Sequence, residues 1–141
     1  MNIDSIQNGI VIDHIAAGRG MRLYELLHLD RLDCSVAIIK NVNSRKMGKK
    51  DIIKIDADVD IDMDVIGFVD PQATVNIIKD GVRADKRCIE TPQMLTNVIR
   101  CMNPRCITTT EQELDHVFRL TDPENKIYRC IYCETKAERK Y

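Results

Sequence analysis

Four cysteines in two close pairs constrain this chain more than any other feature of its sequence. Cys101 and Cys106 are separated by four residues, and Cys130 and Cys133 by two. Short spacers let both sulfurs of a pair point inward from one tight turn, and two such turns complete the tetrahedral thiolate shell that Zn²⁺ favours. The sequence therefore predicts one structural zinc ion on these residues, with no open coordination position for catalysis.

Other interpretations of the cysteines exist. The four could form two disulfides or stay as buried thiols, and His116, which lies between the pairs, could replace one of them as a ligand.

The N-terminal stretch lacks the basic segment of a secretory signal, and no apolar run approaches the roughly 18 residues of a membrane span. We therefore expect a cytoplasmic protein whose cysteines bind metal or remain free. Cys34 and Cys88, without nearby partners, are expected in the core.

The composition is that of a soluble globular protein, with 44% apolar and 30% charged residues. The formal net charge of −1 argues against a general polyanion binder. Aromatic residues make up only 4% and Trp is absent, which argues against a stacking platform for single-stranded nucleic acid. We expect neither nucleic acid nor a membrane as a partner.

Apolar periodicity predicts a compact α/β unit followed by a smaller one. Period-two alternation predicts four strands, at Ile10–Ile15, Ser35–Asn41, Asp51–Asp56 and Ala73–Lys79. Helical spacing predicts one helix around Leu23–Leu27 and a shorter one around Ile61–Phe68. The order strand, helix, strand, strand, helix, strand is that of a ferredoxin-like sandwich, an antiparallel sheet with two helices. The predicted class is α+β, ending in a small all-β zinc domain.

The predicted boundary falls between Thr91 and Pro92, within a linker near residues 86–95. This gives one domain over residues 1–91 and a second over residues 92–141. A unit of about 45–50 residues rarely buries enough apolar surface to fold alone, so it usually needs a staple such as a metal ion. The cysteines supply that staple.

Three further motifs could suggest a function, but each also has a purely structural interpretation. The acidic run at 56–64 lacks the Gly and Glu that a calcium loop needs, so we interpret it as a solvated edge. The basic stretch at 45–54 is no P-loop, but Lys50 and Lys54 share one strand face and could grip phosphate, or simply flank a solvated hairpin. Asp13 and His14 are adjacent, and a lone histidine beside an aspartate more often has a structural role than a catalytic one. No catalytic constellation stands out, so we do not expect an enzyme.

Taken together, these pieces resemble a known family. Four motifs carry the resemblance, in family order: Gly9–Ile15 (GIVIDHI), Met47–Ile55 (MGKKDIIKI), Pro71–Asn76 (PQATVN) and the cysteine tetrad with CIYCE at its second pair. The chain resembles the regulatory chain of aspartate carbamoyltransferase, the allosteric subunit of an enzyme of pyrimidine biosynthesis. The resemblance covers nearly the whole chain.

The resemblance implies a non-catalytic adaptor. Its N-terminal domain would bind nucleoside triphosphates, with CTP and UTP inhibiting and ATP activating, and would pair with a second regulatory chain. Its zinc domain would dock on the catalytic chain, so that regulatory dimers link catalytic trimers. The implied nucleotide-binding residues are Asp4, Ile6, Val11, Asp13, His14, Lys50, Lys54, Asn76, Ile78 and Lys86.

The chain departs from the family pattern in two places. Gly81 stands where the family often has an aromatic residue on the base, and only eight residues precede Gly9. Two rival interpretations remain, a zinc-ribbon module that binds nucleic acid or a protein, and a free-standing metabolite sensor. Residues 92–141 are nearly neutral, which disfavours the nucleic-acid module.

Overall fold

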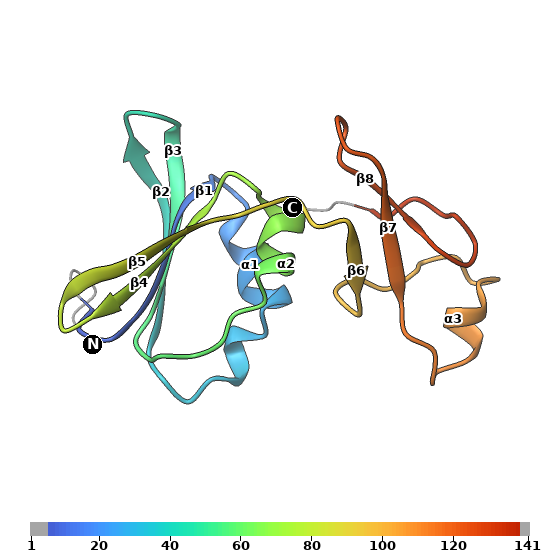
Figure 1. The fold of residues 1–141 in the computed structure, drawn as a ribbon, viewed down its shortest axis with the longest axis horizontal. Helices are drawn as coiled ribbons and strands as arrows, with labels where there is room; N and C mark the ends of the chain where they lie inside the picture. Colours follow the sequence, from blue (N-terminus) through green and yellow to red (C-terminus); the bar gives the residue numbers. More distant parts are fainter. Residues whose placement is uncertain (1–5, 139–141) are drawn as a thin grey trace. The chain divides into compact units, whose positions relative to one another are not determined.

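The computed structural model of the chain describes residues 6–138. The chain divides between Glu90 and Thr91 into two compact units. The first unit is a sheet covered by helices, and the second is a small sheet beside the four cysteines (Figure 1). Asp4, one of the residues expected at the nucleotide site, lies outside the described residues.

Five antiparallel strands form the sheet of the first unit. They are β1 (Gly9–Ala16), β2 (Val36–Ser44), β3 (Gly48–Ile55), β4 (Thr74–Lys79) and β5 (Val82–Cys88). Their order across the sheet is β2-β3-β1-β4-β5, and every neighbouring pair is antiparallel. The first four strands have the arrangement of a ferredoxin-like sandwich, which confirms the α+β class. β5 adds an edge strand.

Two helices cover one face of this sheet (Figure 1). They are α1 (Gly20–Leu26), followed by the 3₁₀ turn η1 (Leu29–Arg31), and α2 (Met63–Val69). The strand residues on this face, such as Ile12 and Ile53, are fully buried against helix residues such as Leu23 and Phe68. Because strand side chains alternate, the neighbouring residues Val11 and Lys54 lie on the opposite face, which the helices leave open.

Two buried carboxylates brace the end of β1. Asp51 is fully buried, and its carboxylate accepts hydrogen bonds from the backbone N–H groups of Gly18, Gly20 and Asn41 at 3.0–3.1 Å. Asp70 accepts from the backbone N–H of Ala16 at 2.7 Å. Hydrogen bonds to buried charged groups stabilise by roughly 1.5–3 kcal/mol each, so these acids tie the loop before α1 to the sheet.

The structure corrects two expectations about this unit and adds a strand that the sequence did not predict. The predicted linker at 86–95 begins too early, because Lys86 and Cys88 belong to β5. Cys88 is exposed and Cys34 is half-buried, so the expectation that both are core residues is wrong. The segment of β5 carries no apolar alternation, because every one of its side chains is exposed. Backbone pairing with β4, rather than burial, makes it a strand.

The second unit is built on a three-stranded antiparallel sheet. Its strands are β6 (Met94–Thr96), β7 (Val117–Asp122) and β8 (Ile127–Cys130), in that order. Phe118 and Tyr128 are its largest buried side chains, and the Tyr128 hydroxyl donates to the Pro92 carbonyl at 2.6 Å. The unit was predicted to be all-β, but it also contains one helical turn, α3 (Ile107–Thr110). No helix within residues 6–138 has the length and hydrophobicity that a membrane span requires.

Candidate functional site

Four cysteine sulfurs meet in the second unit. Cys101 Sγ lies 3.5 Å from Cys133 Sγ, and Cys106 Sγ lies 3.7 Å from Cys130 Sγ. All four sulfurs fall within 4.8 Å of one another. A tetrahedral Zn²⁺ with Zn–S bonds of about 2.3 Å holds its sulfurs about 3.8 Å apart, whereas a disulfide needs about 2.05 Å. The spacing matches a metal shell, and all four cysteines are unpaired, which rules out the two-disulfide interpretation.

The chemistry of the cluster also fits a divalent cation. Burial raises the pKa of Cys101 to about 12 and raises the pKa of Cys130 as well. Burial opposes ionisation of Cys133 too, but hydrogen bonds from Thr135 and Asn103 outweigh it and lower the pKa of that thiol to about 6. Because burial opposes ionisation of these thiols, a bound cation that stabilises their thiolates would offset that cost.

Two threonines support the cluster. The Thr108 hydroxyl lies 3.0 Å from Cys106 Sγ, and the Thr135 hydroxyl lies 3.1 Å from Cys133 Sγ. Sequence reasoning missed both, although each follows the second cysteine of its pair by two residues. His116 is not among the clustered ligand atoms: its Nδ1 accepts from the backbone N–H of Cys101 at 3.1 Å. It positions a cysteine rather than replacing one.

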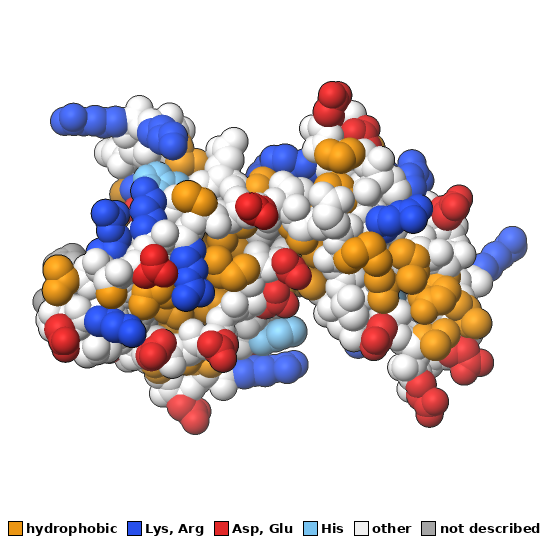
Figure 2. All heavy atoms as spheres, in the orientation of Figure 1, with side chains coloured by type: hydrophobic (Ala, Val, Ile, Leu, Met, Phe, Trp, Pro, Cys, Tyr) orange, Lys and Arg blue, Asp and Glu red, His pale blue; other side chains and the backbone are white. Residues whose placement is uncertain are grey.

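The open face of the first sheet carries a cross-strand row of predicted site residues. Val11 on β1 pairs with Lys54 on β3 and with Asn76 on β4, and Asn76 pairs with Lys86 on β5. Residues directly opposite each other on neighbouring strands point to the same side. The row therefore places two ammonium groups and one amide on one face, around an apolar centre. Figure 2 shows Lys and Arg side chains gathered over the first unit.

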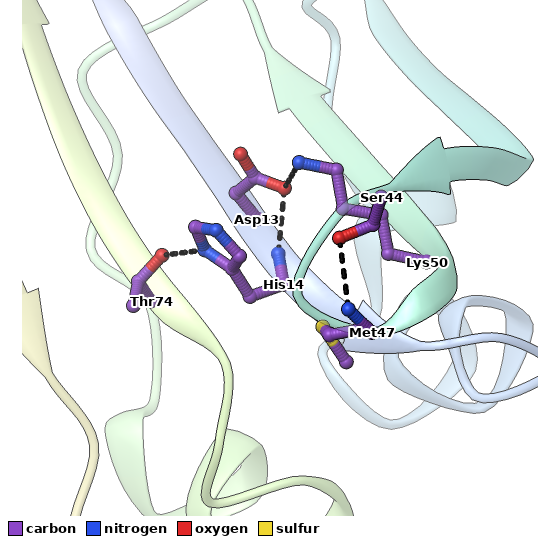
Figure 3. A network of polar contacts seen from close by, with 6 residues as sticks. All are labelled: Asp13, His14, Ser44, Met47, Lys50 and Thr74. Carbon is purple, nitrogen blue, oxygen red and sulfur yellow. Dashed lines mark hydrogen bonds and ion pairs between the residues drawn. The ribbon is translucent and has the colours of Figure 1, made fainter.

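Asp13, His14 and Lys50 form a polar group beside this row (Figure 3). Lys50 Nζ lies 2.9 Å from Asp13 Oδ1, and His14 Nδ1 lies 2.9 Å from the hydroxyl of Thr74. Strand alternation alone would send Asp13 and His14 to opposite faces. A register shift between Ile12 and Ile15, with φ +59° at His14, places both on the open face, since Ile12 and Ile15 are both fully buried.

The end of the open face away from Asp13 and Lys50 is apolar. Ile78 on β4 lies opposite Gly9 on β1, and Ile6 is buried close to Gly9. A Cβ at Gly9 would collide with the carbonyl oxygen of Ile55, so this position excludes a side chain. Nine of the ten expected residues thus lie in the first unit, with Asp13 and Lys50 toward one end of the open face and Ile78 toward the other.

One atom in the row lacks a partner. Asn76 Oδ1 is buried, and it has no hydrogen-bond partner among the described residues. An unsatisfied buried acceptor costs about 1–3 kcal/mol, so it marks a position where a ligand's hydroxyl or amine can donate. The Lys54 and Lys86 side chains lie opposite Val11 and Asn76 in the same row. This face therefore has the chemistry to bind an anion that carries a hydrogen-bond donor.

A ferredoxin-like unit with an open cationic face, joined to a unit held by four cysteines, defines a two-domain, metal-stabilised binding protein. Residues 1–90 match the allosteric domain of the aspartate carbamoyltransferase regulatory chain, and residues 93–141 match its metal-binding domain. Regulatory chains from two bacteria are close in sequence. The Clostridium tetani chain is 49% identical over 135 residues, covering 95% of this chain and 94% of its own. The Bifidobacterium longum chain is 44% identical over 138 residues, covering 98% and 99%.

The chain therefore belongs to the aspartate carbamoyltransferase regulatory chain family. It is a non-catalytic, regulatory subunit with an allosteric domain and a metal-binding domain, and the cysteine cluster is the metal centre of the second. The catalytic chain is its implied partner. The expected family and the expected structural zinc are both confirmed, and the nucleic-acid interpretation of the cysteine pairs is not supported.

Proposed function

We propose that the open face of the first unit binds a nucleoside triphosphate, and that the second unit docks the chain on catalytic trimers. CTP and UTP would inhibit the enzyme and ATP would activate it. The cross-strand row of Lys54, Val11, Asn76 and Lys86 carries the proposal. Residues 1–91 would be the nucleotide-binding domain and residues 92–141 the docking domain.

The charge of the face suits a triphosphate. Three lysines on the face (Lys50, Lys54 and Lys86) lie near the carboxylate of Asp13 or in the neighbouring row, so cationic groups outnumber carboxylates among the described residues of the site. Ammonium groups act as point charges on phosphate oxygens, and the half-buried position of Lys50 and Lys54 limits screening by water. Asn76 Oδ1 can accept from a ribose hydroxyl or from an exocyclic amine of the base. The apolar end at Ile78 suits the base.

The metal unit presents apolar residues next to its cysteines. Met102 and Ile107 each follow a cysteine, and Ile131 and Tyr132 lie between Cys130 and Cys133. All four side chains are 44–69% exposed, and Figure 2 shows hydrophobic side chains gathered on the second unit. Exposed apolar patches of this kind mark protein interfaces. Because the metal-binding turns carry these residues, metal binding and docking would depend on each other.

Two further parts of the proposal concern assembly and location. The first unit would pair with a second copy, so that regulatory dimers link catalytic trimers; its sheet ends in the edge strands β2 and β5. The protein would work in the cytoplasm, where a reducing environment keeps cysteines free to bind metal.

Calorimetric titration of the zinc-loaded chain with CTP, UTP and ATP tests the nucleotide site. Lys86→Ala should weaken binding roughly tenfold or more, because a charge-assisted hydrogen bond is worth about 1.5–3 kcal/mol. Lys79→Ala is the matched control: Lys79 is an exposed lysine on β4 whose neighbours lie on the helix side of the sheet. Heats equal to dilution for all three nucleotides at millimolar concentration would contradict the proposal.

A further inference from the structure

Arg83 on β5 faces the same side of the sheet as the proposed nucleotide residues. It lies directly opposite Ile78, just as Lys86 lies opposite Asn76. Arg87, further along β5, lies opposite Val75, which is buried on the helix side. The two arginines therefore project from opposite faces of one strand. Arg83 belongs to the open face and stands at its apolar end.

This apolar end offers a floor for a nucleobase. Ile78 and Val11 are half-buried, and Gly9 between them on the sheet has no side chain. Asp13 and Lys50 form their ion pair at the other end, and Lys54 and Lys86 lie in the row between the two ends. A nucleotide on this face would place its phosphates near the lysines and its flat base over the apolar floor.

The neighbouring turn cannot supply a ring to cover the base. Asp80 and Gly81 both have positive φ, at +53° and +77°, and the Gly81 N–H donates to the carbonyl of Gln7 at 2.9 Å. A Cβ at Gly81 would stand only 3.1 Å from Gln7 Oε1. A bulky side chain at this position would thus be both strained and crowded. A side chain that covers the base would therefore come from another residue.

We infer that Arg83 stacks its guanidinium on the base of the bound nucleoside triphosphate and favours purines over pyrimidines. The inference rests on the proposed nucleotide site. A guanidinium is flat and delocalised, and it stacks on aromatic rings, where a lysine ammonium cannot. Arg83 is exposed, and no ion pair within residues 6–138 holds it, whereas Arg87 lies 3.3 Å from Asp85. Purines offer the larger stacking surface, so they gain more from Arg83.

Variants at position 83 separate stacking from charge. Arg83→Ala and Arg83→Lys should each weaken ATP binding about tenfold, within the range measured for loss of one base-stacking contact, and should weaken CTP binding less. Arg83→Tyr should restore most of the ATP affinity, because a tyrosine ring stacks without a charge. Inorganic tripolyphosphate, which has no base, should bind the Lys variant as tightly as the original chain. Arg87→Ala is the matched control and should leave all affinities unchanged.

The outcomes divide cleanly. The inference would be overturned if Arg83→Lys bound ATP as tightly as the original chain, or if Arg83→Ala did. Either result would leave the proposed nucleotide site intact. Equal losses for ATP and tripolyphosphate would show a charge contact and also overturn it. Failure of the original chain to bind any nucleotide would instead remove the proposed function itself. Thermal unfolding of each variant checks that this exposed edge position leaves the fold unchanged.

Discussion

Lys50 Nζ lies 2.9 Å from Asp13 Oδ1, and the same carboxylate oxygen accepts the backbone N–H of His14 at 2.6 Å. The pair is mostly buried, with 16% of the Lys50 side chain and 21% of the Asp13 side chain exposed. A phosphate bound at the proposed site would therefore compete with Asp13 for Lys50, and the carboxylate would limit the affinity of this face for bare polyanions.

Removing that carboxylate should strengthen phosphate binding. Asp13→Asn keeps an oxygen for the His14 N–H but frees Lys50, so tripolyphosphate should bind at least about fivefold more tightly, since roughly 1 kcal/mol is the upper end for an exposed pair and this pair is mostly buried. Nucleotides should gain less if Asp13 also accepts from the ribose. Asp85→Asn, which removes a carboxylate from the other face of the sheet, is the control. Calorimetry at two salt concentrations makes the measurement, and weaker tripolyphosphate binding in Asp13→Asn would contradict this role.

The metal should hold the second unit together. Structural zinc can contribute roughly 10–16 kcal/mol of apparent binding energy at neutral pH, which exceeds the stability of a unit of this size. Cys130→Ser should therefore unfold the chain from about residue 96 onward and leave the first unit folded. Hydrogen exchange resolved by peptide, together with zinc analysis, measures both effects. Cys88→Ser, an exposed cysteine outside the cluster, should change neither. Full protection of β7 and β8 in zinc-free protein would contradict the prediction.

The threonines beside the sulfurs should tune metal affinity. Thr108→Val and Thr135→Val remove hydroxyls that lie 3.0 and 3.1 Å from ligand sulfurs, and loss of such supporting groups typically costs 10–100-fold in affinity. Each variant should release zinc to a competing chelator about tenfold more readily. Thr121→Val, on the exposed side of β7, should behave like the original chain. Equal release from all three variants would show that the hydroxyls do not support the metal.

Asp51 should matter for stability of the first unit. Asp51→Asn exchanges one carboxylate oxygen for an amide that cannot accept, so at least one of the three backbone N–H groups loses its partner. We expect a loss of about 2–3 kcal/mol in the free energy of unfolding. Hydrogen exchange of β1 and β3 amides reports it, and Asp56→Asn, an exposed residue just after β3, is the control. A loss no larger than that of the control would contradict the bracing role.

Within the first unit, the sequence predicted the four strands that carry runs of apolar side chains and missed β5, whose side chains are all exposed. β1 and β3 alternate around buried residues such as Ile12 and Ile53, so their periodicity is visible, while β2 and β4 carry mostly half-buried apolar side chains. β5 is exposed on both faces, and the one-turn helix α3 buries only Thr108, so neither leaves a periodic pattern. Strand periodicity also assumes a regular pleat. It could not predict the bulge at His14, which depends on backbone geometry and on the partner strand.

The candidate sites show the same division. The metal ligands were predictable because the short spacing within each cysteine pair is typical of a zinc site. Their threonine partners were not, because the only sequence signal is a threonine two residues after each pair. The nucleotide residues came from resemblance. What the residues alone could not provide is their cross-strand register, which aligns Lys54, Asn76 and Lys86 from three separate strands. The same register places Arg83 opposite Ile78 on this face, although no local sequence motif identifies Arg83.

Reconstitution with the catalytic chain tests the adaptor function most directly. Catalytic trimers are mixed with the zinc-loaded chain, separated on a sizing column, and assayed for carbamoyl aspartate formation across aspartate concentrations, with and without CTP or ATP. We predict a larger complex whose saturation curve CTP and ATP shift in opposite directions. Removal of zinc should return both elution and kinetics to those of the free trimer, since the docking residues flank the metal ligands. Separate elution and superimposable curves with and without the chain would contradict the regulatory function.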